Sequence, residues 1–315
     1  MKPNNFTSSE KWTETEDLLC LTPIFADGTV KYLKGFSVLN ILLSITAFLG
    51  NTLILVAMRR ESIYLHRPSK LLFRCLATTD LCVGLIAQPV AVVFLLSLVF
   101  KRTYLCRFAI LASSVVNYLL CSVSLSTMTA ISLDRLLALI LRIRYRQVVT
   151  LKRASFVVVN IWVTAIVAAS LYFVNPRITV WYGRIGIPMC LTLSFASYTK
   201  IFHTLRRRVQ VQDHAQQEQQ LNYVFPLNTA RYRKAVYSSL WVQVVLVVCY
   251  LPHHIVITFS TYSRLSSSQL LAWSITGLLV YLNSSLNPLL YCWKITEVRQ
   301  AVKEIIRGSL LCPWS

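Results

Sequence analysis

The chain has 315 residues, of which 55% are hydrophobic and only 14% are charged, and its formal net charge is +20. This composition is typical of an integral membrane protein and argues against a soluble globular domain. On a soluble domain such a charge would favour nucleic acid, but here most of it lies between long apolar runs, so we expect no nucleic-acid partner.

Residues 1–34 are polar and of mixed charge, so we expect no cleavable signal peptide, and the first apolar run would act as an uncleaved signal anchor. The triplet Asn5-Phe6-Thr7 is a glycosylation acceptor, which functions only in the secretory lumen. We therefore predict a short extracellular tail with a glycan site at Asn5.

Seven long apolar runs follow, and an α-helix needs about 20 apolar residues to cross a bilayer. The predicted spans are residues 35–58, 71–100, 106–141, 154–176, 178–199, 235–263 and 265–293. Pro89 is expected to kink the second span. The fifth span is the weakest pattern, because it reaches full length only if Arg184 snorkels near its outer end.

The segments between the spans decide the orientation. With the N-terminus outside, most of the 32 basic residues lie on the cytoplasmic side, as membrane proteins require. Residues 294–307 repeat apolar side chains at helical spacing beside Lys and Arg, which predicts an amphipathic helix on the membrane surface.

The predicted fold is therefore all-α, an integral membrane bundle of seven transmembrane helices with a C-terminal amphipathic surface helix. We expect an extracellular tail (1–34), a seven-span domain (35–293) and a cytoplasmic helix and tail (294–315). The expected location is the plasma membrane, crossed several times, with the N-terminus extracellular and the C-terminus cytoplasmic.

Polar and proline-containing motifs recur inside these spans in a fixed order. They are Gly50-Asn51, Leu76-Ala77-Thr78-Thr79-Asp80, Asp134-Arg135-Leu136, Trp162, Tyr198, Cys249-Tyr250-Leu251-Pro252 and Asn287-Pro288-Leu289-Leu290-Tyr291. With this order the chain resembles the rhodopsin-like (class A) G-protein-coupled receptors, from Gly50 to about Cys312. The resemblance implies a receptor that binds an extracellular ligand within the bundle and activates a heterotrimeric G protein. It implies no enzyme, and the residues form no nucleophile or metal-catalytic set.

Asp80 lies within a predicted span, where an ionisable group costs about 2.5 kcal/mol or more, so it needs polar partners inside the bundle. The resemblance implies that these partners are Asn51, Ser124, Asn283, Ser284 and Asn287. Together they are similar to the sodium pocket of the family, whose oxygen ligands suit a hard cation. The alternative is a hydrogen-bonded polar patch with water and no ion. No other cofactor or metal is expected.

Asp134 and Arg135 end the third span, and in the family this arginine leaves its acidic neighbour on activation and contacts the G protein. Pro288 bends the seventh span, and Tyr198 and Tyr291 correspond to two tyrosines that swing inward. Two simpler interpretations remain open. Arg135 is also favourable to a helix dipole and a membrane surface, and Tyr198 fits an interfacial aromatic belt.

The chain departs from the family pattern at several positions. Leu136 replaces a usual tyrosine, Tyr250 a usual tryptophan, and Cys190 a usual proline. The cysteine that the family keeps in the second extracellular loop is missing, and this short loop is similar to that of the melanocortin, cannabinoid and lysophospholipid receptors.

Two further cysteine questions stay open. Cys106 lies one turn earlier than the family alignment requires. It has Cys20 as a candidate disulfide partner, but connectivity cannot be read from sequence. Cys312 at the end of the surface helix is either a palmitoylation site or a free thiol.

The resemblance also implies a ligand pocket that is mostly aromatic and apolar with a few polar groups. It is lined by Asn117, Tyr118, Cys121, Tyr250, His253, His254, Trp273, Gly277 and Tyr281. Asn117 replaces the aspartate of amine receptors, and Tyr281 replaces the retinal lysine of opsins. Either histidine fits equally well as a core residue with satisfied partners.

Basic residues without acids in the extracellular loops favour an anionic ligand, such as a lipid phosphate or an acidic peptide, although the acidic tail is an alternative partner for them. The expected partners are thus a small-molecule, lipid or peptide ligand, a heterotrimeric G protein and the bilayer. The competing classes are a seven-span channel or transporter, which ion flux would reveal, and a receptor-like protein that does not signal.

Overall fold

The computed structural model describes residue 20 and residues 27–60, 66–218, 227–260, 267–294 and 296–311. For residues 211–218, 227–240 and a few other helical positions it describes the backbone alone. Asn5 and Cys312 lie outside the described residues.

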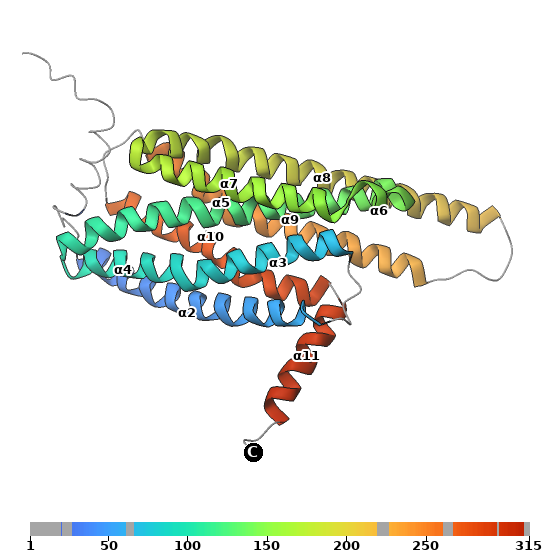
Figure 1. The fold of residues 1–315 in the computed structure, drawn as a ribbon, viewed down its shortest axis with the longest axis horizontal. Coiled ribbons are helices and arrows are strands. Elements are labelled where there is room, and N and C mark those ends of the chain that lie inside the picture. Colours follow the sequence, from blue (N-terminus) through green and yellow to red (C-terminus); the bar gives the residue numbers. More distant parts are fainter. Residues whose placement is uncertain are drawn as a thin grey trace, which may run out of the picture.

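The described chain is a bundle of long helices (Figure 1). The elements are α2 (Asp27–Ala57), α3 (Arg67–Cys82), η1 (Val83–Ala87), α4 (Gln88–Val99), α5 (Thr103–Leu141), η2 (Arg142–Arg144), α6 (Tyr145–Val148), α7 (Leu151–Val174), α8 (Pro176–Glu218), α9 (Leu227–Ser260), α10 (Ser267–Lys294) and α11 (Thr296–Leu311). Each predicted span coincides with one long helix, or with α3, η1 and α4 for the second. The all-α prediction is confirmed.

Several boundaries differ from those expected. Helix α2 begins at Asp27, eight residues before the uncharged run, because a helix extends into water once its core is anchored. Helices α8 and α9 continue into the segment between the fifth and sixth predicted spans. The expected surface helix is α11, which leaves the bundle at an angle in Figure 1.

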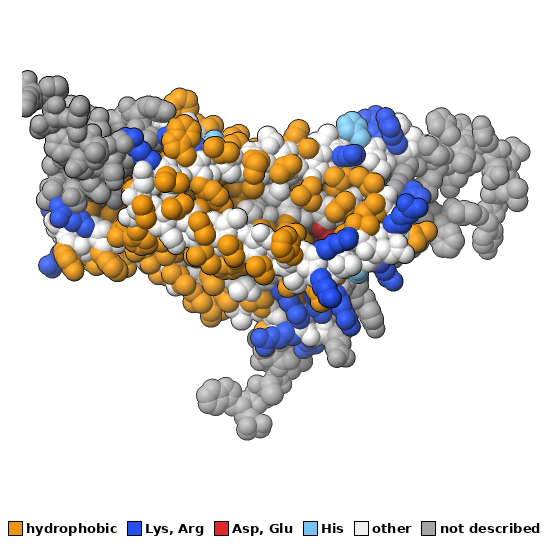
Figure 2. Space-filling view, turned by 45° about the horizontal axis from the view of Figure 1, so that its top comes forward, with side chains coloured by type: hydrophobic (Ala, Val, Ile, Leu, Met, Phe, Trp, Pro, Cys, Tyr) orange, Lys and Arg blue, Asp and Glu red, His pale blue; other side chains and the backbone are white. Residues whose placement is uncertain are grey.

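Five helical stretches in the described ranges are long and apolar enough to cross a membrane. They are Gly28–Ala57, Arg67–Val99, Thr103–Val148, Leu151–Val174 and Pro176–Arg207. The sixth and seventh expected spans are α9 and α10, and α9 contributes the shorter apolar helix Val244–Phe259. Figure 2 shows apolar side chains over the middle of the visible face and Lys and Arg toward both ends of the bundle, with more of them at one end. That distribution is the one a bilayer requires.

Helix α5 is the centre of the bundle. It packs against α3, α4, α7 and α8. The outer ring closes because α8 packs on α9, α9 on α10, and α10 on α2. A core cluster at one end joins residues of α2, α3, α5, α8, α9, α10 and α11, among them Ile54, Leu76, Met128, Leu246 and Val298. Since α5 contacts most of the other spans, its polar residues are positioned to connect them.

The second span contains a π-helical turn where a proline kink was expected. Pro89 has no N–H, so the carbonyl of Leu85 receives no donor from it. The turn Val83–Ala87 absorbs this defect, and the N–H of Gln88 donates to the carbonyl of Val83 instead. A π-bulge of this kind is an established way to redirect a helix.

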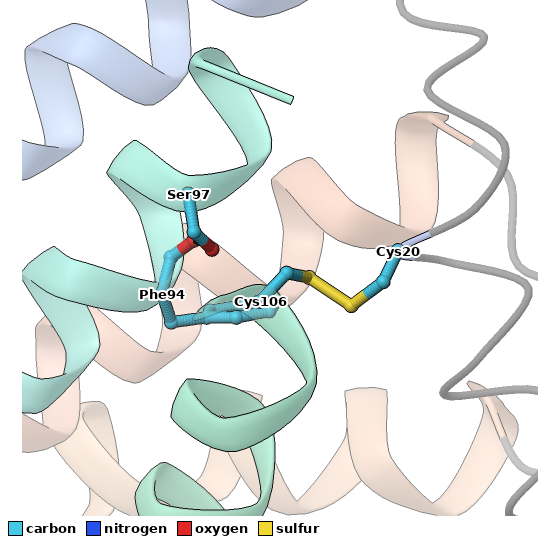
Figure 3. The surroundings of a disulfide bond; sticks show 4 residues. All are labelled: Cys20, Phe94, Ser97 and Cys106. Atoms are coloured by element: carbon cyan, nitrogen blue, oxygen red, sulfur yellow. Dashed lines mark hydrogen bonds between the residues drawn. A yellow bond between two sulfur atoms is a disulfide. The ribbon is translucent and has the colours of Figure 1, made fainter. Parts of the chain in front are cut away.

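A disulfide joins Cys20 to Cys106 at the start of α5, with Cα atoms 5.9 Å apart. Figure 3 shows it beside Phe94 and Ser97 of α4. Both cysteines are buried in a cluster that includes Leu33 of α2 and Leu270 of α10. The bond therefore fixes the residue at position 20 against one end of four helices, α2, α4, α5 and α10.

Candidate functional site

The centre of the bundle holds the carboxylate of Asp80, whose exposed fraction is 0%. Three side chains donate hydrogen bonds to it: Ser124 Oγ to Oδ1 at 3.1 Å, Ser284 Oγ to Oδ1 at 2.8 Å and Asn287 Nδ2 to Oδ2 at 2.6 Å. The donors come from α5 and α10, so the carboxylate connects these helices to α3. Hydrogen bonds of this kind offset the cost of burying a charge.

The two other residues predicted for this site are close to it but do not contact the carboxylate by a hydrogen bond. Asn51 Nδ2 donates to the carbonyls of Ala47 and Ser284, at 2.8 and 3.1 Å. Asn283 Nδ2 points to Met128 Sδ at 3.5 Å. The Oδ1 atoms of both asparagines are buried and have no hydrogen-bond partner in the described part of the chain. Both amide oxygens can therefore accept a further partner.

A second buried carboxylate, that of Asp134, lies near the C-terminal end of α5. Ser69 Oγ donates to Oδ2 at 2.8 Å, and Tyr145 OH donates to Oδ1 at 2.6 Å. Arg135 Nη2 lies 3.6 Å from Oδ2, and the Arg135 guanidinium lies 5.3 Å from the centre of the Phe73 ring. The arginine is therefore held by one long ion pair and one cation–π contact, which makes it easier to release than its acidic neighbour.

Ser69 and Tyr145 were not predicted from the sequence. No motif marks them, and their role depends on α3 and α6 approaching the end of α5. Tyr145 lies in α6, beyond the predicted third span, and its hydroxyl donates to the carboxylate of Asp134.

Tyr198 and Tyr291 line one small cavity of about 30 Å³ between α3, α5, α8 and α10. Phe73 also lines it and packs edge-on against Tyr291, with ring centres 5.2 Å apart. The Tyr291 hydroxyl is buried and has no hydrogen-bond partner in the described residues. Such a volume suits about one water molecule. Pro288 lies one turn before Tyr291 in α10. Its ring packs so closely against Gly50 that a Cβ added there would lie 2.9 Å from the ring.

The predicted ligand residues lie toward the opposite end of the bundle and belong to α5, α9 and α10. Tyr281 OH donates to Asn117 Oδ1 at 2.7 Å, and Asn117 Nδ2 donates to Ser113 Oγ at 3.1 Å. His253 Nδ1 lies 3.1 Å from Thr276 Oγ1. This histidine therefore has a hydrogen-bond partner within the bundle, as a core histidine would. Thr276, Ser113 and Tyr172 were not predicted; Tyr172 stacks near Tyr118 at 6.2 Å between ring centres.

The remaining predicted pocket residues differ in their surroundings. Tyr250 and Cys121 pack into the apolar core cluster. Near Gly277 an added Cβ would meet nothing within 4 Å, so there is open space beside α10. His254 Nδ1 and Trp273 Nε1 are buried polar atoms without a hydrogen-bond partner in the ranges that the structure covers. Among the predicted pocket residues, His254 and Trp273 therefore have the polar atoms that are most readily available to a ligand.

The arrangement as a whole is a helical membrane bundle with a polar centre, an aromatic outer region and a charged pair at one end of its central helix. A family model described as 7 transmembrane receptor (rhodopsin family) matches residues 50–180 and 174–291. These matches cover well over half of the chain, so the chain belongs to the rhodopsin family of seven-transmembrane receptors. It is a G-protein-coupled receptor embedded in a membrane.

Proposed function

We propose that this receptor binds its extracellular ligand between the outer halves of α5, α9 and α10 and signals through release of Arg135. Ligand bound against Asn117, His254, Trp273 and Tyr281 would favour one arrangement of α5, α9 and α10 over another. A ligand shifts such an equilibrium only by its differential affinity for the two arrangements. The proposed activity involves no covalent chemistry.

The observation that best supports the switch is the unequal hold on the two members of the charged pair. Asp134 is fixed by two short hydrogen bonds, whereas Arg135 contacts it at 3.6 Å. The guanidinium is always charged and planar, so it can exchange a carboxylate for acceptors on a G protein without changing its protonation. The inward tyrosines Tyr198 and Tyr291 would then complete the open form.

Nucleotide exchange on a purified heterotrimeric G protein tests the proposal, with receptor reconstituted in nanodiscs. Arg135→Ala should lose most basal or ligand-stimulated exchange, since the group that meets the G protein is gone. Arg146→Ala is the matched control, because Arg146 is exposed on α6 and its replacement causes the same change of net charge. Equal exchange by wild type and Arg135→Ala would contradict the switch.

We also propose a sodium ion beside Asp80 as an allosteric ligand. Asp80, Ser124 and Asn283 supply a carboxylate, a hydroxyl and an otherwise unpartnered amide oxygen, and this oxygen-only set suits a hard cation. Ser284 and Asn287 hold the carboxylate in place. When bound, the ion would neutralise the buried charge and favour the closed arrangement.

The proposed location is the plasma membrane, with the N-terminus and the 1–34 tail outside and α11 on the cytoplasmic surface. The exposed cations on the Asp134 end support this orientation, among them Arg59, Arg142, Lys152 and Lys303. The Cys20–Cys106 bond at the opposite end supports it independently, because disulfides persist in oxidising compartments. A glycan at Asn5 and a lipid on Cys312 are proposals that rest on the sequence alone.

A further inference from the structure

A shallow, open groove of about 600 Å³ runs along an exposed face of α8, at the end of the stretch that is apolar enough to cross a membrane. Its described lining begins with Phe195 and Ala196 and ends with Arg207. Phe195 is 60% exposed, so an apolar side chain projects into this groove. None of the residues described as lining the groove belongs to the ligand site or to the Asp134–Arg135 pair.

The chemistry of the groove changes along the helix axis. Beyond the apolar Phe195 the lining presents three nitrogen-bearing side chains, Lys200, His203 and Arg207. Thr199 and Thr204 add hydroxyl groups between them. No acid lies among residues 195–207. The groove therefore joins an apolar end to a cationic end that donates hydrogen bonds, which is the complement of an anionic amphiphile.

The position of the groove relative to the bilayer agrees with this chemistry. The stretch that is apolar enough to cross a membrane is Pro176–Arg207, so the cations occupy its last two turns. From Phe195 to Arg207 the helix rises about 18 Å, enough to run from the acyl-chain region to the headgroup region. Lys and Arg at such a boundary extend their charged ends to the interface.

We propose that this groove binds one anionic phospholipid, with its phosphate between Lys200 and Arg207 and an acyl chain along Phe195 and Ala196. The occupant comes from the leaflet at the Asp134 end of the bundle, which is the cytoplasmic leaflet under the orientation proposed above. A lipid held there lies against α8, whose Tyr198 and Ile201 pack toward α5. The groove is thus a lipid site distinct from the extracellular ligand pocket.

Photolabelling of the full-length receptor tests the proposal, in phosphatidylcholine nanodiscs that contain a small fraction of phosphatidylserine with a photoreactive acyl chain. Both leaflets are supplied, and no G protein is present, so neither the orientation nor the signalling mechanism affects the result. Labelled peptides are produced by pepsin, whose cleavage does not depend on basic residues. We expect label within residues 195–207, and photoreactive phosphatidylcholine should label this segment much less.

Lys200→Ala and Arg207→Ala should each reduce phosphatidylserine labelling of the segment by about fivefold. Lys152→Ala is the matched control, since Lys152 is exposed at the start of α7 and its loss gives the same change of net charge. It should leave the labelling unchanged. Thermal unfolding of all three variants in detergent checks that they remain folded, as truncation of exposed side chains should allow.

Three outcomes would overturn the proposal. The first is equal labelling by phosphatidylcholine and phosphatidylserine, which would mean that the groove is an apolar surface that does not recognise the headgroup. The second is equal loss in Lys152→Ala and Lys200→Ala, which would mean attraction by net charge alone. The third is full competition by soluble glycerophosphoserine at the lipid's own concentration, which would mean a site for free phosphate esters.

Discussion

The carboxylate of Asp80 and its three donors are the most buried polar cluster that the structure describes. Three neutral donors cannot remove the charge, and the Oδ1 atoms of Asn51 and Asn283 remain unused nearby. A sodium ion bound there would neutralise the carboxylate charge and would also be coordinated by an otherwise unused amide oxygen. A patch in which water takes this place would respond to salt only through ionic strength.

Replacing sodium by choline at constant ionic strength therefore distinguishes a bound sodium ion from a polar patch that holds water. For the wild type we expect sodium to lower basal nucleotide exchange. We also expect it to raise stability by about 1 kcal/mol once its concentration is several times its Kd. Asp80→Asn keeps the shape but removes the charge, so both effects should disappear. Thermal unfolding and exchange assays measure them, and equal behaviour of the wild type in sodium and choline would eliminate the ion.

Tyr145 is the second residue-scale test, because its hydroxyl donates to the buried Asp134. Tyr145→Phe should lower the free energy of unfolding by about 1.5–3 kcal/mol, as for other hydrogen bonds to charged groups. Tyr104, which is 90% exposed, provides the control Tyr104→Phe, expected to have almost no effect. Thermal unfolding in detergent measures both; equal stability of the two variants would show that the bond contributes nothing.

At the scale of elements, the contact between α2 and α10 depends on a glycine. A Cβ at Gly50 would lie 2.9 Å from Cγ and 3.1 Å from Cβ of Pro288, too close for either helix to stay in place. We expect Gly50→Ala to destabilise the bundle by about 1–3 kcal/mol through overpacking. Gly186→Ala in α8 is the matched control, because nothing lies within 4 Å of its added Cβ.

The control should be neutral or slightly stabilising, since Ala favours a helix over Gly by about 1 kcal/mol. Both variants are compared by thermal unfolding in the same detergent. A Gly50→Ala receptor as stable as Gly186→Ala would mean that α2 and α10 can move apart without cost, and that the close approach is not a constraint on the fold.

The spans were predictable because the bilayer imposes a minimum apolar length, and an uncharged run such as residues 35–58 exceeds that length. The ends of the helices were less predictable. In α8 the helix continues to Glu218 through polar sequence, where neither the bilayer nor a cap sets the boundary. The π-helical turn before Pro89 was not predicted either, because a proline reveals the missing donor but not how the chain compensates for it.

The site was predictable to the extent that motifs mark it. Ser124, Ser284 and Asn287 contact Asp80 as the resemblance implied, whereas Asn283 contacts Met128 instead. Ser69 and Tyr145 carry no such mark, because each contacts Asp134 only after separate helices have packed. Side-chain contacts between distant segments depend on interhelical geometry, which a single sequence does not contain.

At the scale of the whole molecule, α5 connects the two ends of the receptor. Asn117 in the ligand region, Ser124 at the polar centre and Asp134 at the other end lie on one helix of 39 residues. Asn117 bonds to α10, Ser124 to α3, and Asp134 to both α3 and α6. A shift of α5 would change all three contacts together, which is the physical basis for coupling between distant sites.

The Cys20–Cys106 disulfide closes a loop with a sequence separation of 86 residues and holds one end of that central helix. A cross-link of this length restricts the unfolded chain, so its removal should cost about 2–5 kcal/mol. We expect Cys20→Ser to lower the midpoint of thermal unfolding. Dithiothreitol should lower the wild-type midpoint to a similar degree and leave that of Cys20→Ser unchanged, which makes the variant its own control. Alkylation of both thiols in unreduced wild type, detected by mass spectrometry, would show that the bond does not form in the membrane. Residue 20 would then not be tied to the start of α5, and the apolar cluster around Leu33, Leu98 and Leu270 would have to close that end of the bundle without the cross-link.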